Sequence, residues 1–185
     1  MENHGPGDEP HPDLRTSGWG ATVLRTANRL EPSGDIRGVV YGTVVSGSVL
    51  AIASRHTESA EGLGLEVLST LIVYWLAHVY CQVLWERYTH GIRLRASEIG
   101  RALVHEIGIL KGGVAPIVVM LVARLAGAEF GTAVWIGLWT TVLLLFLTGI
   151  VAGLRSGARG TELGVDALIG GLFGLVLVLF KAGLH

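Results

Sequence analysis

The stretch FGTAVWIGLWTTVLLLFLTGIVAGL, residues 130–154, contains 25 consecutive residues without a charge. A helix of this length is more than long enough to cross a hydrocarbon core of about 30 Å. Two other charge-free runs, 17 residues after Arg37 and 19 residues after Glu66, are also long enough. Half of the 185 residues are hydrophobic and the mean hydropathy is +0.55, which indicates an integral membrane protein.

Two weaker apolar stretches extend this pattern. One covers residues 112–128 and is interrupted only by Arg124, and the other covers residues 163–180 and is interrupted only by Asp166. We therefore predict an all-α, polytopic bundle of five transmembrane helices. Their expected positions are about 37–55, 65–86, 112–128, 131–153 and 163–181. A polar, disordered tail (1–17) would precede one helical membrane domain (18–185).

The distribution of basic residues tests this count, because short cytoplasmic loops carry the excess of positive charge. Five spans place eleven of the fourteen basic residues on one side of the membrane and three on the other. A four-span arrangement would put basic loops on both sides. We predict a multi-pass protein of the cell membrane with its N-terminus in the cytoplasm and its C-terminus outside. The three residues on the outer side are Arg55, Arg124 and Lys181.

Two more helices are expected beside the spans. Trp19–Leu30 would form an N-terminal interfacial helix, with Arg25 and Arg29 turned towards anionic lipid headgroups. A cytoplasmic amphipathic helix would begin near Ser97 and present Ile99, Leu103, Ile107 and Leu110 on one face. Together with the basic loops, these helices predict contact with the bilayer and with anionic headgroups at the cytoplasmic face.

Small residues line one face of the first and fifth spans. Gly38, Gly42 and Ser46 recur every four residues in the first, and Gly170 and Gly174 do so in the fifth. Such faces allow close helix packing in lipid. The spacing leaves open whether these two helices pack on each other or across the interface of a homodimer.

Five polar residues follow one another at four-residue intervals through the second span, and so form one slowly winding stripe. A polar stripe should face the bundle interior, another subunit or a water-filled cavity rather than lipid. His78 lies near mid-membrane, where it can carry protons or ligate a metal; alternatively, it is a neutral histidine hydrogen-bonded to a neighbouring helix. The stripe, either a polar path or a structural network, consists of Glu66, Thr70, Tyr74, His78 and Gln82.

The chain contains no phosphate-binding glycine motif, no HExxH, no CxxC and no supported catalytic triad. We therefore expect no enzyme activity, no catalytic or cofactor-binding residues and no metal site. His105 next to Glu106 is interpreted as a solvated face, because adjacent helical residues point about 100° apart. No nucleic-acid partner is expected.

Local sequences in the second half of the chain resemble the vacuolar iron transporter family. ILKGGVAPIVVML (109–121) is similar to that family's Gly-x-x-x-Pro entry to its third helix, and residues 145–157 and 163–184 are similar to its last two helices. The resemblance implies a five-helix membrane protein that moves iron. The chain departs from the family pattern in its first span, where no carboxylate follows Gly42.

Two functional hypotheses follow from these features. The first is a small transporter-like protein, distantly related to the iron transporters, with a polar path along the second span. The second is a non-transporting membrane scaffold or assembly protein that binds lipids or partner proteins. For a bundle this small, a homodimer would enlarge a transport path by forming it at the subunit interface.

Overall fold

The computed structural model describes residues 36–90, 96–158 and 160–183. Within these ranges the regular structure is entirely helical, which confirms the all-α prediction. The predicted tail (1–17) and interfacial helix (Trp19–Leu30) lie outside the described residues. The helices are α2 (Ile36–Ala53), α3 (Ala60–His90), α4 (Ala96–His105), α5 (Ile107–Leu125), α6 (Phe130–Ser156) and α7 (Thr161–Gly183).

Five helical stretches are long and apolar enough to cross a membrane, as predicted. They correspond to α2, α3, α5 with the end of α4, α6 and α7. The described part of the chain therefore has the helices of a multi-pass membrane protein.

The ends of the helices differ from the predicted spans. α3 and α6 run several residues past them because polar and charged residues continue a helix outside the apolar region. α5 begins at Ile107 rather than 112, since Lys111 is exposed on the helix and does not interrupt it. α6 ends where Gly157 adopts φ 85°, a left-handed conformation that favours glycine.

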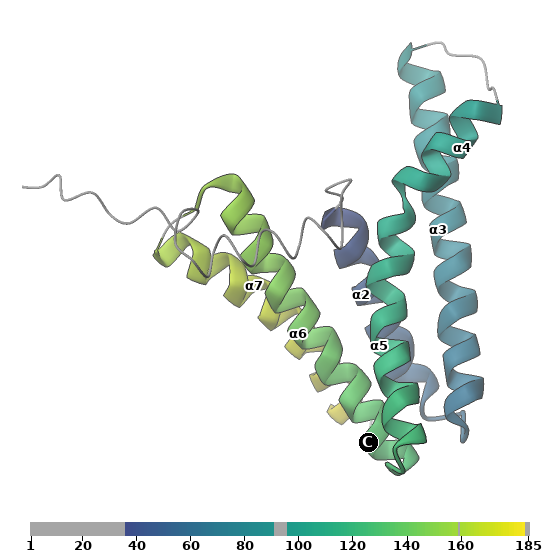
Figure 1. The fold of residues 1–185 in the computed structure, drawn as a ribbon, viewed down its shortest axis with the longest axis vertical. Coiled ribbons are helices and arrows are strands. Elements are labelled where there is room, and N and C mark those ends of the chain that lie inside the picture. Colours follow the sequence, from purple (N-terminus) through teal and green to yellow (C-terminus); the bar gives the residue numbers. More distant parts are fainter. Residues whose placement is uncertain (1–35, 91–95, 159, 184–185) are drawn as a thin grey trace, which may run out of the picture.

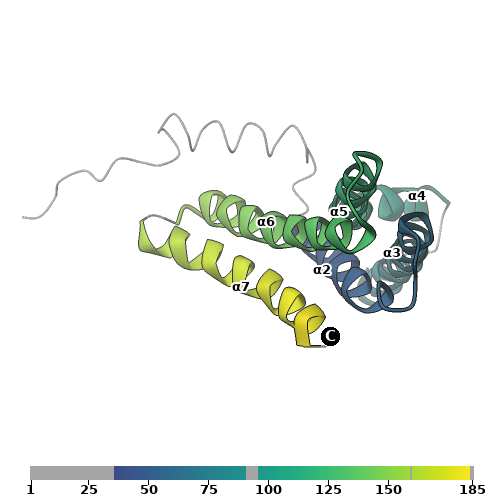
Figure 2. The same cartoon turned by 90° about the horizontal axis from the view of Figure 1, so that it is seen from below.

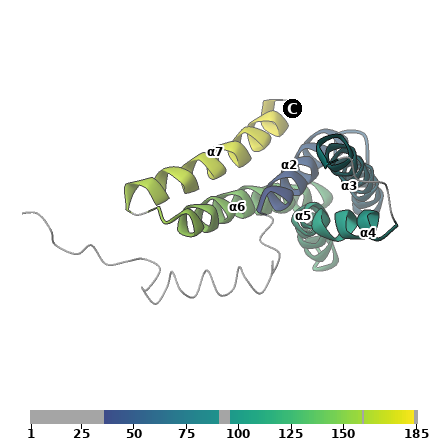
Figure 3. The ribbon, with the colours of Figure 1, turned by 90° about the horizontal axis from the view of Figure 1, so that it is seen from above.

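The spanning helices form two groups (Figure 1). α2, α3 and α5 cluster together, whereas α6 and α7 run side by side away from that cluster (Figures 2 and 3). The two groups meet towards the end of the molecule where the chain finishes. The buried core extends from there along α2, α3 and α5 as far as Ile109, and also includes residues of α6 and Val178 of α7. Leu50, Leu71, Ile109, Met120 and Leu138 are fully buried in it.

α2 and α5 run in the same direction, and glycine lets their backbones meet. A Cβ atom placed on Gly42 would collide with the carbonyl oxygen of Ile109, and one on Gly112 would collide with that of Val39. A Cβ on Gly113 would lie 2.9 Å from the carbonyl oxygen of Gly42. The small-residue face predicted for the first span thus packs on the third span.

Glycine also lets the backbones of α6 and α7, which run antiparallel, pack closely together. A Cβ atom on Gly170 would collide with the carbonyl oxygen of Leu145, and one on Gly174 would lie 2.7 Å from the Cα of Val142. The small-residue face of the fifth span therefore packs on the fourth span. The two faces singled out from the sequence mainly contact these partners rather than each other.

α2 and α7 also touch near their C-terminal ends. A Cβ atom on Gly47 would lie 2.9 Å from Leu177 Cδ1, and Lys181 Nζ donates a hydrogen bond of 2.6 Å to Ser54 Oγ. Lys181 is buried although it carries a charge. This contact brings the ends of the first and last spans to the same end of the bundle, as an odd number of crossings requires.

Candidate functional site

The lower part of the predicted stripe, Glu66 and Thr70 on α3, is exposed in the single chain. The Glu66 carboxylate accepts a hydrogen bond of 3.0 Å from the hydroxyl of Thr57, in the α2–α3 connection. The Thr70 hydroxyl donates to the backbone oxygen of Glu66 over 2.9 Å. Both side chains thus find partners on their own helix or the adjoining loop.

Tyr74 and His78, in the upper part of the stripe, face α2. Tyr74, His78 and Gln82 are half-buried, and the ring centroids of Tyr74 and His78 lie 4.8 Å apart. Across the helix interface, the ring of Tyr41 lies 5.3 Å from that of His78. The structure therefore places His78 against two tyrosine rings, one from each helix.

Sequence reasoning missed Tyr41. It lies on the first span, which was interpreted only as a small-residue packing surface. A signal was present, because Tyr41 is the single aromatic residue of α2. An aromatic side chain on an otherwise aliphatic and small helix is a natural partner for a ring on a neighbouring span.

A second polar group lies deeper in the bundle, where no site was predicted. Thr43 and Ser46 of α2 and Thr141 of α6 are all fully buried. The Thr141 hydroxyl donates to the Gly137 carbonyl over 3.2 Å, and a Cβ atom on Gly47 would lie 2.7 Å from the Thr141 methyl carbon. We call Thr43, Ser46 and Thr141 the hydroxyl core.

The hydroxyl core adjoins an irregularity in α5. Pro116 lies inside this helix and is buried. Proline has no backbone N–H, so the carbonyl of Gly112, four residues earlier, loses the donor that normally binds it in an α-helix. The Thr43 hydroxyl reaches this carbonyl at 3.2 Å. The sequence signal was the Gly112–Pro116 spacing, which the sequence analysis used only for its likeness to the iron transporters.

His105 and Glu106 come together although they are adjacent in sequence. α4 ends at His105 and α5 begins at Ile107, so the helix is interrupted at Glu106. His105 Nδ1 then lies 3.4 Å from Glu106 Oε1, and Glu106 is buried. The angular argument that separated the two side chains assumed one continuous helix and does not apply at this break.

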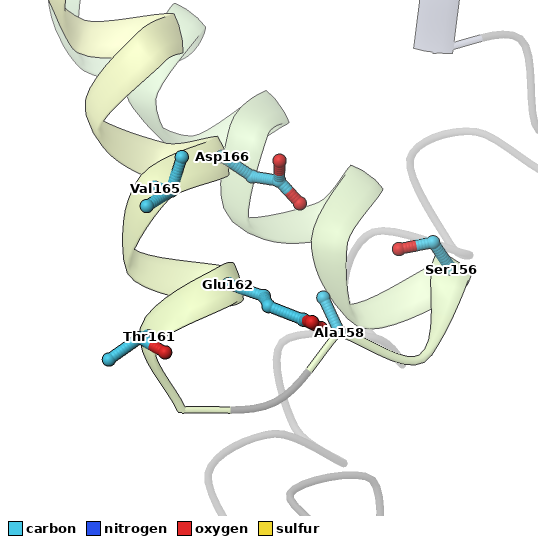
Figure 4. A pocket seen from close by; sticks show the side chains of 6 residues that line it. All are labelled: Ser156, Ala158, Thr161, Glu162, Val165 and Asp166. Carbon is cyan, nitrogen blue, oxygen red and sulfur yellow. The ribbon is translucent and has the colours of Figure 1, made fainter.

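An open pocket lies at the turn between α6 and α7, away from the stripe (Figure 4). Glu162 and Asp166 of α7 stand on one side of it, and Ser156 and Ala158 on the other. Space beside the Asp166 carboxylate depends on Gly153, whose Cβ would lie 2.9 Å from Asp166 Oδ2. The pocket contains none of the five predicted stripe residues.

Among the described residues, no three His, Cys, Asp or Glu side chains come together as a metal site. The chain matches no family model, no curated protein and no solved structure. The five apolar helices agree with the architecture implied by the resemblance to the iron transporters, and none of these comparisons supports membership of that family. The described part of the chain has five helices long and apolar enough to cross a membrane, as a multi-pass membrane protein has.

Proposed function

We propose that the protein is a small transporter-like membrane protein whose polar path follows α3 past Tyr74, His78 and Gln82. One observation carries this proposal: the His78 ring of a spanning helix lies against the rings of Tyr41 and Tyr74. Ionisable side chains inside a membrane commonly serve ion or proton pathways. Histidine changes its charge near neutral pH, and tyrosine hydroxyls both donate and accept hydrogen bonds. The proposal includes no catalytic activity.

The proposed cargo is the proton. Divalent metal ions are the second candidate, because of the sequence resemblance to the iron transporters. Ferrous sites in proteins typically combine imidazole with carboxylate ligands. Glu66 is the carboxylate of the stripe, and it lies at the end of α3 near Thr57. A proton relay uses His78 directly and requires no second carboxylate.

We expect His78→Ala to lower proton flux into proteoliposomes by about tenfold or more, because a proton relay loses the group that accepts and releases the proton. Flux is measured with a pH-sensitive dye after imposing a pH gradient, with Fe²⁺ uptake followed in parallel. Leu76→Ala is the matched control, since Leu76 is exposed on the same helix and carries no proton. Equal flux in the parent protein and His78→Ala would contradict the proposed path.

The alternative function is a non-transporting scaffold or assembly protein. It is favoured by the surface of α3, the least buried of the five spans. Large apolar side chains project from this helix, among them Val73, Tyr80, Trp85 and Tyr88. Parent protein that carries neither protons nor Fe²⁺ in the same assay, while remaining folded, supports this alternative.

The partners we propose are the bilayer, anionic lipid headgroups and a second copy of the chain. Arg37 near the start of α2, Arg87 near the end of α3 and Lys111 near the start of α5 are exposed, and α4 joins α3 to α5 at this end of the bundle. We propose that this end faces the cytoplasm of the cell, with the C-terminus outside, since positive charge is retained on that side. α4 exposes Ile99 and Val104, which suits a helix lying on the membrane surface.

A further inference from the structure

The backbone carbonyl of Gly112 lacks its usual hydrogen-bond donor in α5. Pro116 removes the N–H that would normally bind it, and both residues are buried in α5. In a membrane no water is available to replace that donor, so the freed carbonyl needs a partner from a neighbouring helix. A threonine or serine hydroxyl is the usual replacement.

Thr43 of α2 supplies this donor. Its Oγ1 lies 3.2 Å from the Gly112 oxygen and 2.8 Å from the oxygen of Val39, one turn back on its own helix. A hydroxyl has one proton, so the two acceptors compete for it or share it. Thr43 is fully buried, and its proton therefore stays between α2 and α5.

The hydrogen bond between Thr43 and Gly112 depends on the close approach of the α2 and α5 backbones. A side chain on Gly112 would collide with the Val39 carbonyl, and a Cβ on Gly42 would lie 2.9 Å from the Gly113 nitrogen. The Thr43 hydroxyl can reach across because no Cβ stands in either place. Any change in the bend of α5 at this point therefore changes the hydrogen bond to Thr43.

Ser46 lies one turn further along the same face of α2. It is fully buried, and its hydroxyl has no hydrogen-bond partner in the arrangement described. The contacts of Gly42 with Ile109 and Gly113, together with the parallel course of the helices, put Ser46 near the level of residues 113–117, which include Pro116. A buried, unsatisfied hydroxyl raises the free energy of the arrangement that contains it.

We propose that Gly112–Pro116 is a hinge in α5 and that the Thr43 hydroxyl is its latch. In the latched arrangement, which is the one described, Thr43 shares its hydroxyl between Val39 at 2.8 Å and Gly112 at 3.2 Å, and Ser46 is unsatisfied. In the second arrangement α5 bends differently, Thr43 donates to Val39 alone, and Ser46 donates to a carbonyl of α5. The hinge lets α4 and the first turns of α5 move relative to the rest of the bundle. Proline is a recognised site for such bends.

The test measures the bend of α5 directly. Spin labels are attached at Ile107→Cys and Leu125→Cys, the first and last residues of α5, both exposed and on opposite sides of Pro116, in a Cys81→Ser background. Helix geometry puts these positions about 27 Å apart, within the range of pulsed electron paramagnetic resonance. We expect two distances in the parent protein, and one in Pro116→Ala, because alanine restores the missing N–H.

Thr43→Val removes the hydroxyl and keeps the shape, so the second distance should gain population several-fold. Thr43→Ser keeps the hydroxyl and should match the parent, whereas Ser46→Ala should reduce the second population. Thr43→Val should have no effect in the Pro116→Ala background. A single distance in the parent, or an equal effect of Thr43→Val with and without Pro116, overturns the proposal. If Thr43→Val does not fold, Ser46→Ala and Pro116→Ala decide the question by the same readout.

Discussion

Replacing Gly42 by leucine is expected to destabilise the bundle by about 3 kcal/mol or more, a larger effect than most single substitutions have. Even the first atom of the new side chain would collide with the carbonyl oxygen of Ile109. Backbone cannot rotate aside as a flexible side chain can, so α2 and α5 would have to separate. Separation would also break the hydrogen bond between Thr43 and Gly112. The measurement is reversible unfolding in mixed micelles with SDS, followed by circular dichroism.

The matched control for this variant is Gly131→Leu. Gly131 lies in the first turn of α6, and a Cβ atom there has no neighbour within 4 Å. Leucine favours the helix more than glycine does, so stability should be unchanged or slightly higher. If Gly42→Leu unfolds at the same SDS fraction as Gly131→Leu, the claim that α2 packs closely on α5 is contradicted.

Gly170→Leu is expected to cost about 3 kcal/mol as well, through a different pair of helices. Its side chain would enter the space occupied by the Leu145 carbonyl and force α7 away from α6. α7 would lose its closest contact with the bundle and retain mainly its contacts with α2 near Lys181. Hydrogen exchange should therefore rise in α7 and α6 while the amides of α5 stay protected.

Gly164→Leu provides the comparison on the same helix. Gly164 is exposed, and a Cβ atom there has no neighbour within 4 Å. Exchange in α7 should match that of the parent protein. Uniformly faster exchange in all five spans of Gly170→Leu would show instead that the bundle unfolds as one unit and that α6 and α7 do not form a separate pair.

The spans were predictable because their cause is local. Charges are absent from long runs such as residues 130–154, and lipid excludes unpaired backbone groups, so helices follow directly. Helix ends were less predictable. Lys111 was taken as a boundary, yet a lysine on an exposed helical face extends its side chain to the interface and lets the helix continue.

Helix pairing was not predictable from the same information. Glycine at positions 42 and 170 indicated close packing but not the partner, since spacing along one helix says nothing about which other helix approaches it. The identity of the partner depends on contacts far apart in sequence, such as Thr43 with Gly112. The candidate site was only partly predictable, again because contacts between helices cannot be read from one helix. The stripe on α3 was visible as a four-residue period, whereas Tyr41 and Ser46 could be recognised only from the helices that lie next to them.

The most direct test of the account is the side of the membrane on which each connection lies. Single cysteines are introduced by Glu58→Cys, Glu129→Cys, Tyr88→Cys and Glu162→Cys in a Cys81→Ser background, and all four positions are exposed. Right-side-out vesicles are treated with a membrane-impermeant maleimide before and after permeabilisation. Five spans with the proposed orientation predict that positions 58 and 129 react at once, and that positions 88 and 162 react only after permeabilisation. Reaction of positions 129 and 162 from the same side would contradict the five-span bundle.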